Sequence, residues 1–428
     1  MLGRREFLQL GLLFGGAATF LQSPLRSALA DSATMRLFWF GSPARAERTL
    51  GVARLFEAAN PGVKINGEVG GNDYWSKLTT MLAGGNAPDI FQLAPSRFAD
   101  YARRNTMLPL GDYLGSTIRT DKLMPGVLDL GAVDGKVVGM PLSLNAFALL
   151  YDSVAFDEAA IAPPGPTTTW DDFARLCIDI TKAIGRKNVW AVGNGARYSY
   201  AFEAFLVQRG KRLYGEDGRI GFDATDASDW YGYWESLAKN GGCVSAEVQA
   251  MDKLQIDSNP LSTGHAVMAI AFSNQLLGYQ ALAKNRLGIT SLPIADAARP
   301  SGLFYKASLH FGIASTSRQP ELAARFLDFF INDLAAGKIL GVERGVPINL
   351  DVREAVTPLV DDVSKRSVDY ISSIAGRVGA FPPQVPIGAS ELEERVFRPI
   401  ADQVAFGQLT VAAAGEELVA QANRILRS

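Results

Sequence analysis

Apolar and polar residues change their spacing several times over the segment 37–93, and each spacing predicts one element. Residues 37–40, Leu-Phe-Trp-Phe, form a short apolar run ended by glycine, which is typical of a buried strand. Ser42 and Pro43 suit the N-cap and the first position of a helix, and apolar residues recur at helical intervals after them. Residues 63–69 then alternate between apolar and polar side chains, which is the period of a strand.

The same order of elements continues further along the chain. Asp73 can cap a second helix, which ends at a glycine pair, and residues 88–93 begin a third strand. Strand, helix, strand, helix and strand in succession indicate a parallel sheet covered by helices. Ligands of such sheets bind beyond the carboxyl ends of the strands, so residues 39–42 and 92–96 are candidate binding positions.

Helix signals dominate the rest of the chain. Thr169 and Asp172 have the spacing of a capping box, and the apolar residues that follow them form a helical stripe. Pro320 opens another helix, and the tail from 391 to 428 is predicted as helices interrupted near Pro399. We find no internal repeat and no long Gly/Ser-rich linker in the sequence, which favours compact lobes joined by short crossovers.

Composition narrows the class of protein. The chain has 428 residues, enough for two or three folding units, and a formal net charge of −2. This balance argues against a nucleic-acid-binding protein, which normally has a basic excess. Its two cysteines exclude a disulfide scaffold and a multi-cysteine metal site. Cys177 lies on an apolar helical stripe and is interpreted as a core residue, while a disulfide with Cys243 is left open.

The first thirty residues have the three parts of an export signal. Arg4 and Arg5 are followed by an uncharged stretch over 7–21 and by an Ala-Leu-Ala triplet that ends at Ala30. The stretch is shorter than the roughly 20 helical residues that span a bilayer. The arginine pair resembles a bacterial twin-arginine signal, with the general secretion route as the alternative. We therefore expect cleavage after Ala30 and a periplasmic location.

The residues needed for the common catalytic sites are scarce. His265 and His310 are the only histidines and no Gly-x-Ser-x-Gly elbow accompanies them, so both are interpreted as structural or ligand-binding residues. The sequence also lacks dinucleotide, phosphate and calcium loops. We expect no metal, no cofactor and no enzymatic activity, and paired carboxylates for glycoside cleavage are the alternative that the sequence leaves open.

Aromatic residues spread along the chain suit a sugar ligand. Axial C–H groups of a sugar pack on an aromatic ring, while its hydroxyl groups form hydrogen bonds. Buried polar groups that must be paired also discriminate best between hydroxyl patterns. The polar candidates near predicted strand ends or helix starts are Asp73, Gln92, Asn145, Asn194 and Asn274.

Four groups of segments share their order and their residues with one known family. They are 38–42 with 55–65, 74–90, 134–141 with 150–152 and 163–173, and 264–268 with 272–274. Together they resemble the extracellular sugar-binding proteins of ABC importers, the maltose-binding-like group. The ordered set is more specific than any one member, and the match weakens after about residue 349.

The resemblance implies two α/β lobes with a ligand cleft between them, which is the type II periplasmic binding protein fold. Lobe one would comprise residues 34–141 and 312–345, and lobe two residues 142–311 and 346–428. Segment 141–151 would contain the first hinge crossover, and the lobes would close around the ligand.

The resemblance also implies a set of ligand-binding residues. Matching segments supply Trp39, Phe40, Ser42, Arg45, Asp73, Gln92, Ser143, Asn145, Phe272 and Asn274, flanking positions supply Tyr305, His310 and Arg344, and the polar pattern adds Asn194. Phe272 stands where the family often has tryptophan. Arg45 and Arg344 could pair with the carboxylate or sulfonate of an acidic sugar.

From these features we expect the periplasmic substrate-binding component of an ABC transporter. It would bind a di- or oligosaccharide, neutral or acidic, as a monomer, and would deliver it unchanged to the membrane permease. One alternative is an exported glycoside-cleaving enzyme, which would need two cleft carboxylates about 5–10 Å apart. Another is a binding protein for a polyamine, a metal or an organic acid.

Overall fold

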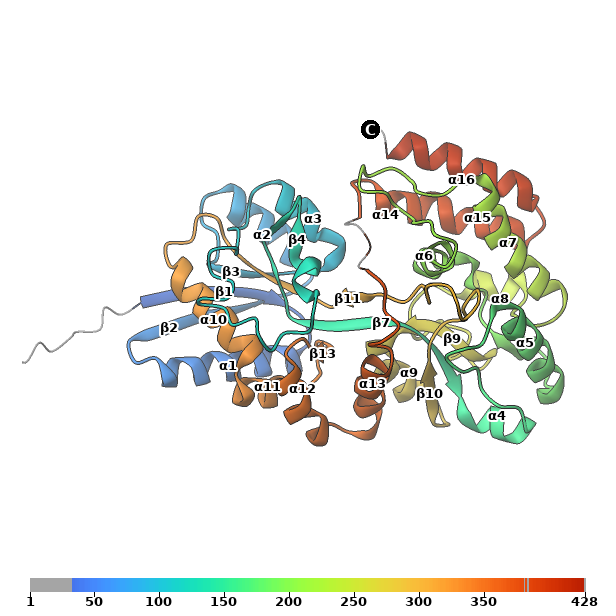
Figure 1. Cartoon of the computed structure of the whole chain (residues 1–428), viewed down its shortest axis with the longest axis horizontal. Helices are drawn as coiled ribbons and strands as arrows, with labels where there is room; N and C mark the ends of the chain where they lie inside the picture. Colours follow the sequence, from blue (N-terminus) through green and yellow to red (C-terminus); the bar gives the residue numbers. More distant parts are fainter. Residues whose placement is uncertain (1–32, 381, 383–384, 427–428) are drawn as a thin grey trace, which may run out of the picture.

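The computed structural model describes residues 33–380, 382 and 385–426, which form two α/β lobes joined by a long strand (Figure 1). The predicted export signal and its cleavage position lie outside the described residues. Each lobe is built on its own sheet, with helices packed around it. None of the helices in the described ranges is long and apolar enough to cross a membrane.

The sheet of the first lobe has five strands in the order β2-β1-β3-β12-β6. They are β1 (Ala33–Phe40), β2 (Val63–Gly70), β3 (Ile90–Leu93), β6 (Met140–Pro141) and β12 (His310–Ile313), and a hairpin of β4 (Ala132–Val133) and β5 (Lys136–Val137) lies beside them. The three strands predicted from the sequence, β1 to β3, run parallel as expected. The sheet as a whole is mixed, because β12 enters it from the other lobe and pairs antiparallel with β3 and β6.

Five helices surround this sheet (Figure 1). They are α1 (Pro43–Ala59), α2 (Tyr74–Ala83), α3 (Pro95–Arg103), α10 (Pro320–Asn332) and α11 (Leu334–Leu340). Ser42 caps α1 as predicted, because its Oγ accepts a hydrogen bond from the backbone N–H of Arg45 at 3.2 Å. Asp73 precedes α2 but makes no capping hydrogen bond, because its backbone (φ −91°, ψ 6°) is not in the extended conformation of an N-cap; its carboxylate pairs with Lys77 at 3.2 Å.

The second sheet has the order β10-β7-β9-β8, and β11 and β13 pair with the start of β7. Its strands are β7 (Ser143–Asp152), β8 (Trp190–Val192), β9 (Ala266–Phe272), β10 (Leu287–Thr290), β11 (Tyr305–Ala307) and β13 (Val346–Pro347). Strand β7 runs from the first lobe into the second (Figure 1). Because β11 and β13 return alongside it, the chain passes between the lobes at one place.

The helices of the second lobe pack around its sheet, with α6, residues 199–207, in the interior of the lobe (Figure 1). They are α4 (Ser153–Ala159), α5 (Trp170–Ile184), α6 (Ser199–Val207), α7 (Ala224–Lys239), α8 (Ala246–Met251), α9 (Leu276–Leu282), α13 (Asp362–Ser373), α14 (Ala389–Leu392), α15 (Arg398–Ala405) and α16 (Val411–Ile425), while α12 (Leu350–Val356) packs on α11. The capping box at the start of α5 forms as predicted, with Thr169 and Asp172 each accepting from the other's backbone N–H. Trp170 then packs edge to face on Trp230 of α7, with ring centroids 5.8 Å apart.

The predicted core cysteine and the predicted helix break can both be located. Cys177 and Cys243 are buried and both are free thiols, so no disulfide joins them in the structure. Burial raises the pKa of each thiol. The interruption near Pro399 is a π-helical turn over 393–397 that leads directly into α15. Pro399 is the second residue after this turn, and because proline has no backbone N–H it removes one hydrogen bond from the helical run.

Candidate functional site

A cavity of about 240 Å³ lies between the two lobes, beside the strands that connect them. The first lobe contributes Ser96 at the start of α3 and His310 of β12 to its wall. The second lobe contributes Tyr200 of α6, Tyr214 and Glu393. The cavity therefore has the position that the sequence predicts for a ligand cleft, next to the carboxyl end of β3.

Cross-strand pairs of β7 and β11 form the floor of this cavity. Paired residues of antiparallel strands project to the same face, and Lys306 is paired with Asn145. Two residues along, on the same face, Phe304 packs edge to face on Phe147 with ring centroids 4.9 Å apart. Phe147, Phe304 and Lys306 all line the cavity.

Phe147 is the centre of an aromatic cluster. Its register partner on β9 is Phe272, one of the predicted site residues, and the two ring centroids are 4.7 Å apart. Tyr200 stacks on Phe147 at 4.6 Å with the ring planes 6° from parallel. The Tyr200 ring is partly exposed, and its hydroxyl forms no hydrogen bond with any residue in the described ranges. It can therefore offer both a ring and a hydroxyl to a ligand.

Lys306 is the cation of the cavity floor. Its ammonium group lies 4.7 Å from the centre of the Phe272 ring, which is a cation–π distance. Within the described part of the chain, Lys306 forms no ion pair. The surrounding protein lowers the pKa of Lys306 by excluding water, and the charge of Glu393 opposes this effect.

Two carboxylates also line the cavity, and both have protein partners. Glu203 is buried, and its Oε2 accepts a hydrogen bond from the backbone N–H of Leu213 at 2.6 Å. Burial raises the pKa of Glu203 to about 7, although the Leu213 N–H and the charge of Arg212 act in the opposite direction. Glu393 forms an ion pair with Arg398 at 2.6 Å.

His310 is a buried wall residue that stays neutral at pH 7. Burial lowers its pKa to about 4. Its Nε2 lies 2.8 Å from the carbonyl oxygen of Leu130, so this nitrogen must carry the proton. The imidazole stacks on Phe98 at 4.1 Å between ring centroids, and its Nδ1 has no hydrogen-bond partner among the described residues.

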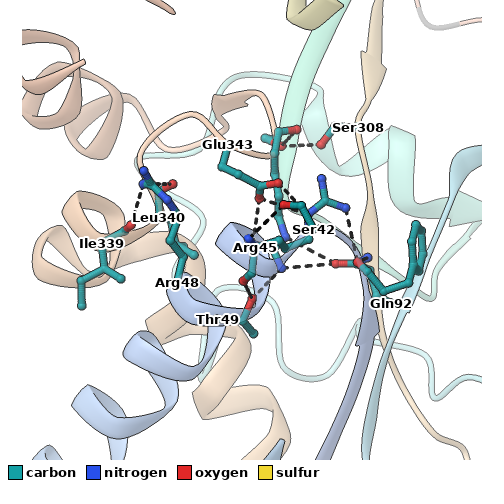
Figure 2. Close-up of polar contacts among 12 residues, drawn as sticks. Ser42, Arg45, Arg48, Thr49, Gln92, Ser308, Ile339, Leu340 and Glu343 are labelled. Carbon is teal, nitrogen blue, oxygen red and sulfur yellow. Dashed lines mark hydrogen bonds and ion pairs between the residues drawn. The ribbon is translucent and has the colours of Figure 1, made fainter. Parts of the chain in front are cut away.

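The predicted residues at the start of α1, Ser42 and Arg45, belong to a polar network outside the cavity lining (Figure 2). Arg45 donates to both carboxylate oxygens of Glu343 at 2.8 and 3.0 Å and also contacts the Phe40 carbonyl at 3.4 Å. Gly41 leaves room for the Arg45 side chain, because a Cβ at position 41 would lie 2.3 Å from Arg45 Cδ. The charge of Arg45 is thus balanced inside the protein, and it does not line the cavity.

Arg344 is buried in the same network, with 7% of its surface exposed. It donates to Thr49 Oγ1 at 2.8 Å and to Gln92 Oε1 at 3.4 Å, while Gln92 Nε2 donates to the Phe40 carbonyl at 2.9 Å. Burial and the neighbouring Arg45 lower the pKa of Arg344 to about 9. The predicted pairing of Arg45 and Arg344 with an acidic ligand gains no support from these positions, since neither arginine lines the cavity and both contact the carboxylate of Glu343.

Ser143 joins the three chain crossings between the lobes. Its Oγ donates to the carbonyl oxygen of Arg344 at 2.7 Å and is also hydrogen-bonded to Ser308 Oγ (Figure 2). The backbone N–H of Ser308 donates to the Ser143 carbonyl at 2.9 Å. Gly345 packs against this junction with φ +120°, and a Cβ there would lie 2.9 Å from Asn145 Oδ1.

Four further predicted residues, Trp39, Asp73, Asn194 and Asn274, lie outside the cavity lining, and a fifth, Tyr305, only borders the cavity. Trp39 is 1% exposed in the core of the first lobe, and Asp73 and Asn274 lie on the surface. Asn194 accepts from the Ala196 N–H at 2.9 Å and so caps a short 3₁₀ turn. Tyr305 borders the cavity, but its hydroxyl donates to the Ile371 carbonyl at 2.9 Å.

Sequence reasoning missed Phe147, Tyr200 and Lys306, which build the floor and one wall of the cavity. The sequence signal for Lys306 is that residues 305–307 form a strand, in which successive side chains point to opposite faces. A shift of one residue in the pairing would move Lys306 to the other face. The pairing register with β7 places Lys306 on the same face as Phe147 and Phe304 and places Tyr305 on the opposite face. Clusters of His, Cys, Asp and Glu that could hold a metal ion are absent from the residues described.

Comparisons with known proteins agree with this architecture. The family model described as bacterial extracellular solute-binding protein matches residues 41–336. A Brucella abortus protein named as a binding protein is 24% identical over 70% of this chain and 72% of its own length. The arabinooligosaccharide-binding protein of Bacillus subtilis is 22% identical over 58% of this chain and 57% of its own.

A solved structure shows the same two-lobed fold. The family 1 extracellular solute-binding protein of Alicyclobacillus acidocaldarius superposes with a TM-score of 0.79 at 27% identity, over 92% of this chain and 99% of its own. The predicted fold class, two α/β lobes with hinge crossovers, is therefore confirmed.

Proposed function

The chain belongs to the family of bacterial extracellular solute-binding proteins, the solute-binding components of ABC transporters, and on this premise we propose that it binds a carbohydrate in the cavity between its lobes. We expect a di- or oligosaccharide that is bound and released without chemical change. The relative from Bacillus subtilis, by its name, binds arabinooligosaccharides, which supports the class of ligand.

The observation that carries the proposal is the aromatic wall with unused polar groups beside it. Tyr200 presents its ring and a hydroxyl without a hydrogen-bond partner among the described residues, and the buried Tyr214 also lines the cavity. Phe147 supports the Tyr200 ring from behind at 4.6 Å, so the ring is held in place before a ligand arrives. A sugar needs this combination, because its C–H faces pack on rings while its hydroxyl groups must be paired.

The remaining steps of transport follow from this role. We propose that the ligand stabilises a closed arrangement of the lobes, which the membrane permease recognises. The division proposed from the resemblance assigns 34–141 and 312–345 to one lobe and 142–311 and 346–428 to the other. The export signal, cleavage after Ala30, a periplasmic location and a monomeric state are further parts of the proposal.

A thermal-shift screen of the purified protein against neutral and acidic saccharides tests the proposal. A ligand at 100 times its Kd should add about 2.7 kcal/mol to the free energy of unfolding, which is a rise of a few degrees in Tm. Titration calorimetry then gives the Kd. We expect Tyr200→Ala to weaken binding about ten- to hundredfold and Tyr200→Phe to weaken it less, because the phenylalanine keeps the stacked ring.

Two results would overturn the proposal. Cleavage of a bound glycoside by the purified protein would support the enzyme alternative, with Glu203 and Glu393 as the carboxylates to replace first. A folded, ligand-free protein that responds to no saccharide but to a polyamine, a metal or an organic acid would keep the family and change the cargo.

A further inference from the structure

We propose that the ligand of the cavity carries an anionic group, a carboxylate as in a uronic acid, which binds Lys306 on the cavity floor and the amide of Asn145 beside it. This inference rests on the proposed function, since it names the kind of saccharide that the site selects. It assigns the recognition of the anion to residues other than Arg45 and Arg344, which lie outside the cavity lining and share the carboxylate of Glu343.

Lys306 has the charge that such a group requires. Its side chain is exposed to the cavity, and no residue of the described ranges forms an ion pair or a hydrogen bond with its ammonium group. The Phe272 ring below it, at 4.7 Å, holds the cation without neutralising it. An unpaired cation in a confined site is stabilised most by a ligand of opposite charge.

Asn145 places an amide N–H donor next to Lys306. It is 6% exposed, and its Oδ1 has no hydrogen-bond partner among the described residues. Its Nδ2 also makes no hydrogen bond within those ranges. Because Asn145 and Lys306 are register partners, their side chains project to the same face of the strand pair, with Lys306 in the cavity lining and Asn145 buried beside it. One carboxylate can accept from the Lys306 ammonium and the Asn145 amide together.

The two carboxylates of the cavity leave this cation available. Glu393 is held by Arg398 at 2.6 Å. Glu203 is held by the Leu213 N–H at 2.6 Å, and near neutral pH part of it is uncharged because burial raises its pKa. Neither forms an ion pair with Lys306.

The position of the pair fits a substituent on a sugar ring. Lys306 and Asn145 lie between the aromatic cluster around Phe147 and the hinge junction at Ser143. A ring packed on the aromatic side can therefore direct a carboxylate toward the hinge. Both lobes are attached to the strands that hold this pair, so the anion is bound where the lobes meet.

Matched sugars that differ only at one carbon test the inference. Titration calorimetry with glucuronate and galacturonate, and with their short oligomers, is compared with the neutral glucose and galactose counterparts. We expect the uronate to bind about ten- to hundredfold more tightly than the neutral sugar, because a charge-assisted hydrogen bond contributes a binding free energy of about that size. Lys306→Met should remove this preference, Lys306→Arg should keep most of it, and Lys239→Met, an exposed lysine of α7, should change nothing.

The outcomes separate this inference from the proposed function. If neutral sugars bind as tightly as uronates and Lys306→Met binds like wild type, the anion site is wrong while carbohydrate binding stands. If no saccharide binds but organic acids bind through Lys306, the anion site stands and the carbohydrate proposal is wrong. Circular dichroism and Tm of Lys306→Met, compared with Lys239→Met, establish that a loss of preference comes from a folded protein.

Discussion

Glu203 is the carboxyl group of the cavity whose ionisation depends most on the fold. Burial raises its pKa from the ordinary 4.5 to about 7, so the folded state holds this proton more tightly than the unfolded state does. The contribution of this residue to stability is therefore full below pH 4.5 and is lost as the pH rises to about 7.

Replacing this group should change the pH dependence of stability. We expect the free energy of unfolding of Glu203→Gln to rise relative to wild type between pH 4.5 and 7, by up to about 3 kcal/mol. Urea unfolding at several pH values measures the difference. His310, whose pKa is lowered, has the opposite slope between pH 4 and 6.5, but it is present in both proteins and cancels. Equal slopes for Glu203→Gln and for the exposed control Glu68→Gln would show that the prediction is wrong.

Gly345 lies at the hinge in a place where no side chain fits. Its φ of +120° is strained for other residues, and a Cβ would lie 2.9 Å from both Asn145 Oδ1 and the Leu144 carbonyl. Gly345→Ala should cost about 1–3 kcal/mol and should also weaken ligand binding, because Asn145 must move. Thermal unfolding and calorimetry measure the two effects. Gly111→Ala is the matched control, since nothing lies within 4 Å of a Cβ there. Equal behaviour of both variants would contradict the prediction.

At the scale of single elements, the N-terminus of α5 should contribute to the stability of the protein but not to its ligand affinity. The Thr169 hydroxyl oxygen accepts a hydrogen bond from the Asp172 N–H at 3.1 Å. The Asp172 carboxylate accepts hydrogen bonds from the hydroxyl and the backbone N–H of Thr169, which lower the pKa of Asp172. Thr169→Ala should cost about 1 kcal/mol because the first turn loses its cap. Thr167→Ala, in the preceding loop, is the control. Neither should change ligand affinity, since α5 does not line the cavity, and a change in Kd for Thr169→Ala would count against this separation.

The elements that sequence reasoning located are those with a local physical cause. Strand β1, the cap at Ser42 and the box at Thr169 depend on residues within a few positions of one another. The site depends on the pairing of distant strands, which local patterns do not determine. Tyr305 and Lys306 are neighbours in sequence and face opposite sides, and only the register with β7 decides between them. Arg344 likewise has the residue type of an anion site, but its partners Thr49 and Gln92 come from other segments.

At the scale of the whole molecule, the hinge is compact enough to act as one joint. The three crossings meet at Ser143, Ser308 and the Arg344 carbonyl, and the Arg45–Glu343 ion pair ties α1 to the turn after α11 (Figure 2). Outside this joint, the lobes face each other across the cavity. A rotation of one lobe against the other therefore requires changes in few backbone angles.

Closure is the last prediction. A saccharide that raises Tm should also decrease the radius of gyration in small-angle X-ray scattering, because a ligand that touches both lobes stabilises the arrangement in which both are near. Tyr200→Ala at the same ligand concentration should keep the larger radius, since it binds too weakly to saturate. At a concentration that saturates the variant, the decrease should return. Tight binding to wild type with an unchanged radius would mean that the ligand is held without lobe closure, and the permease would then have to recognise something other than a change of shape.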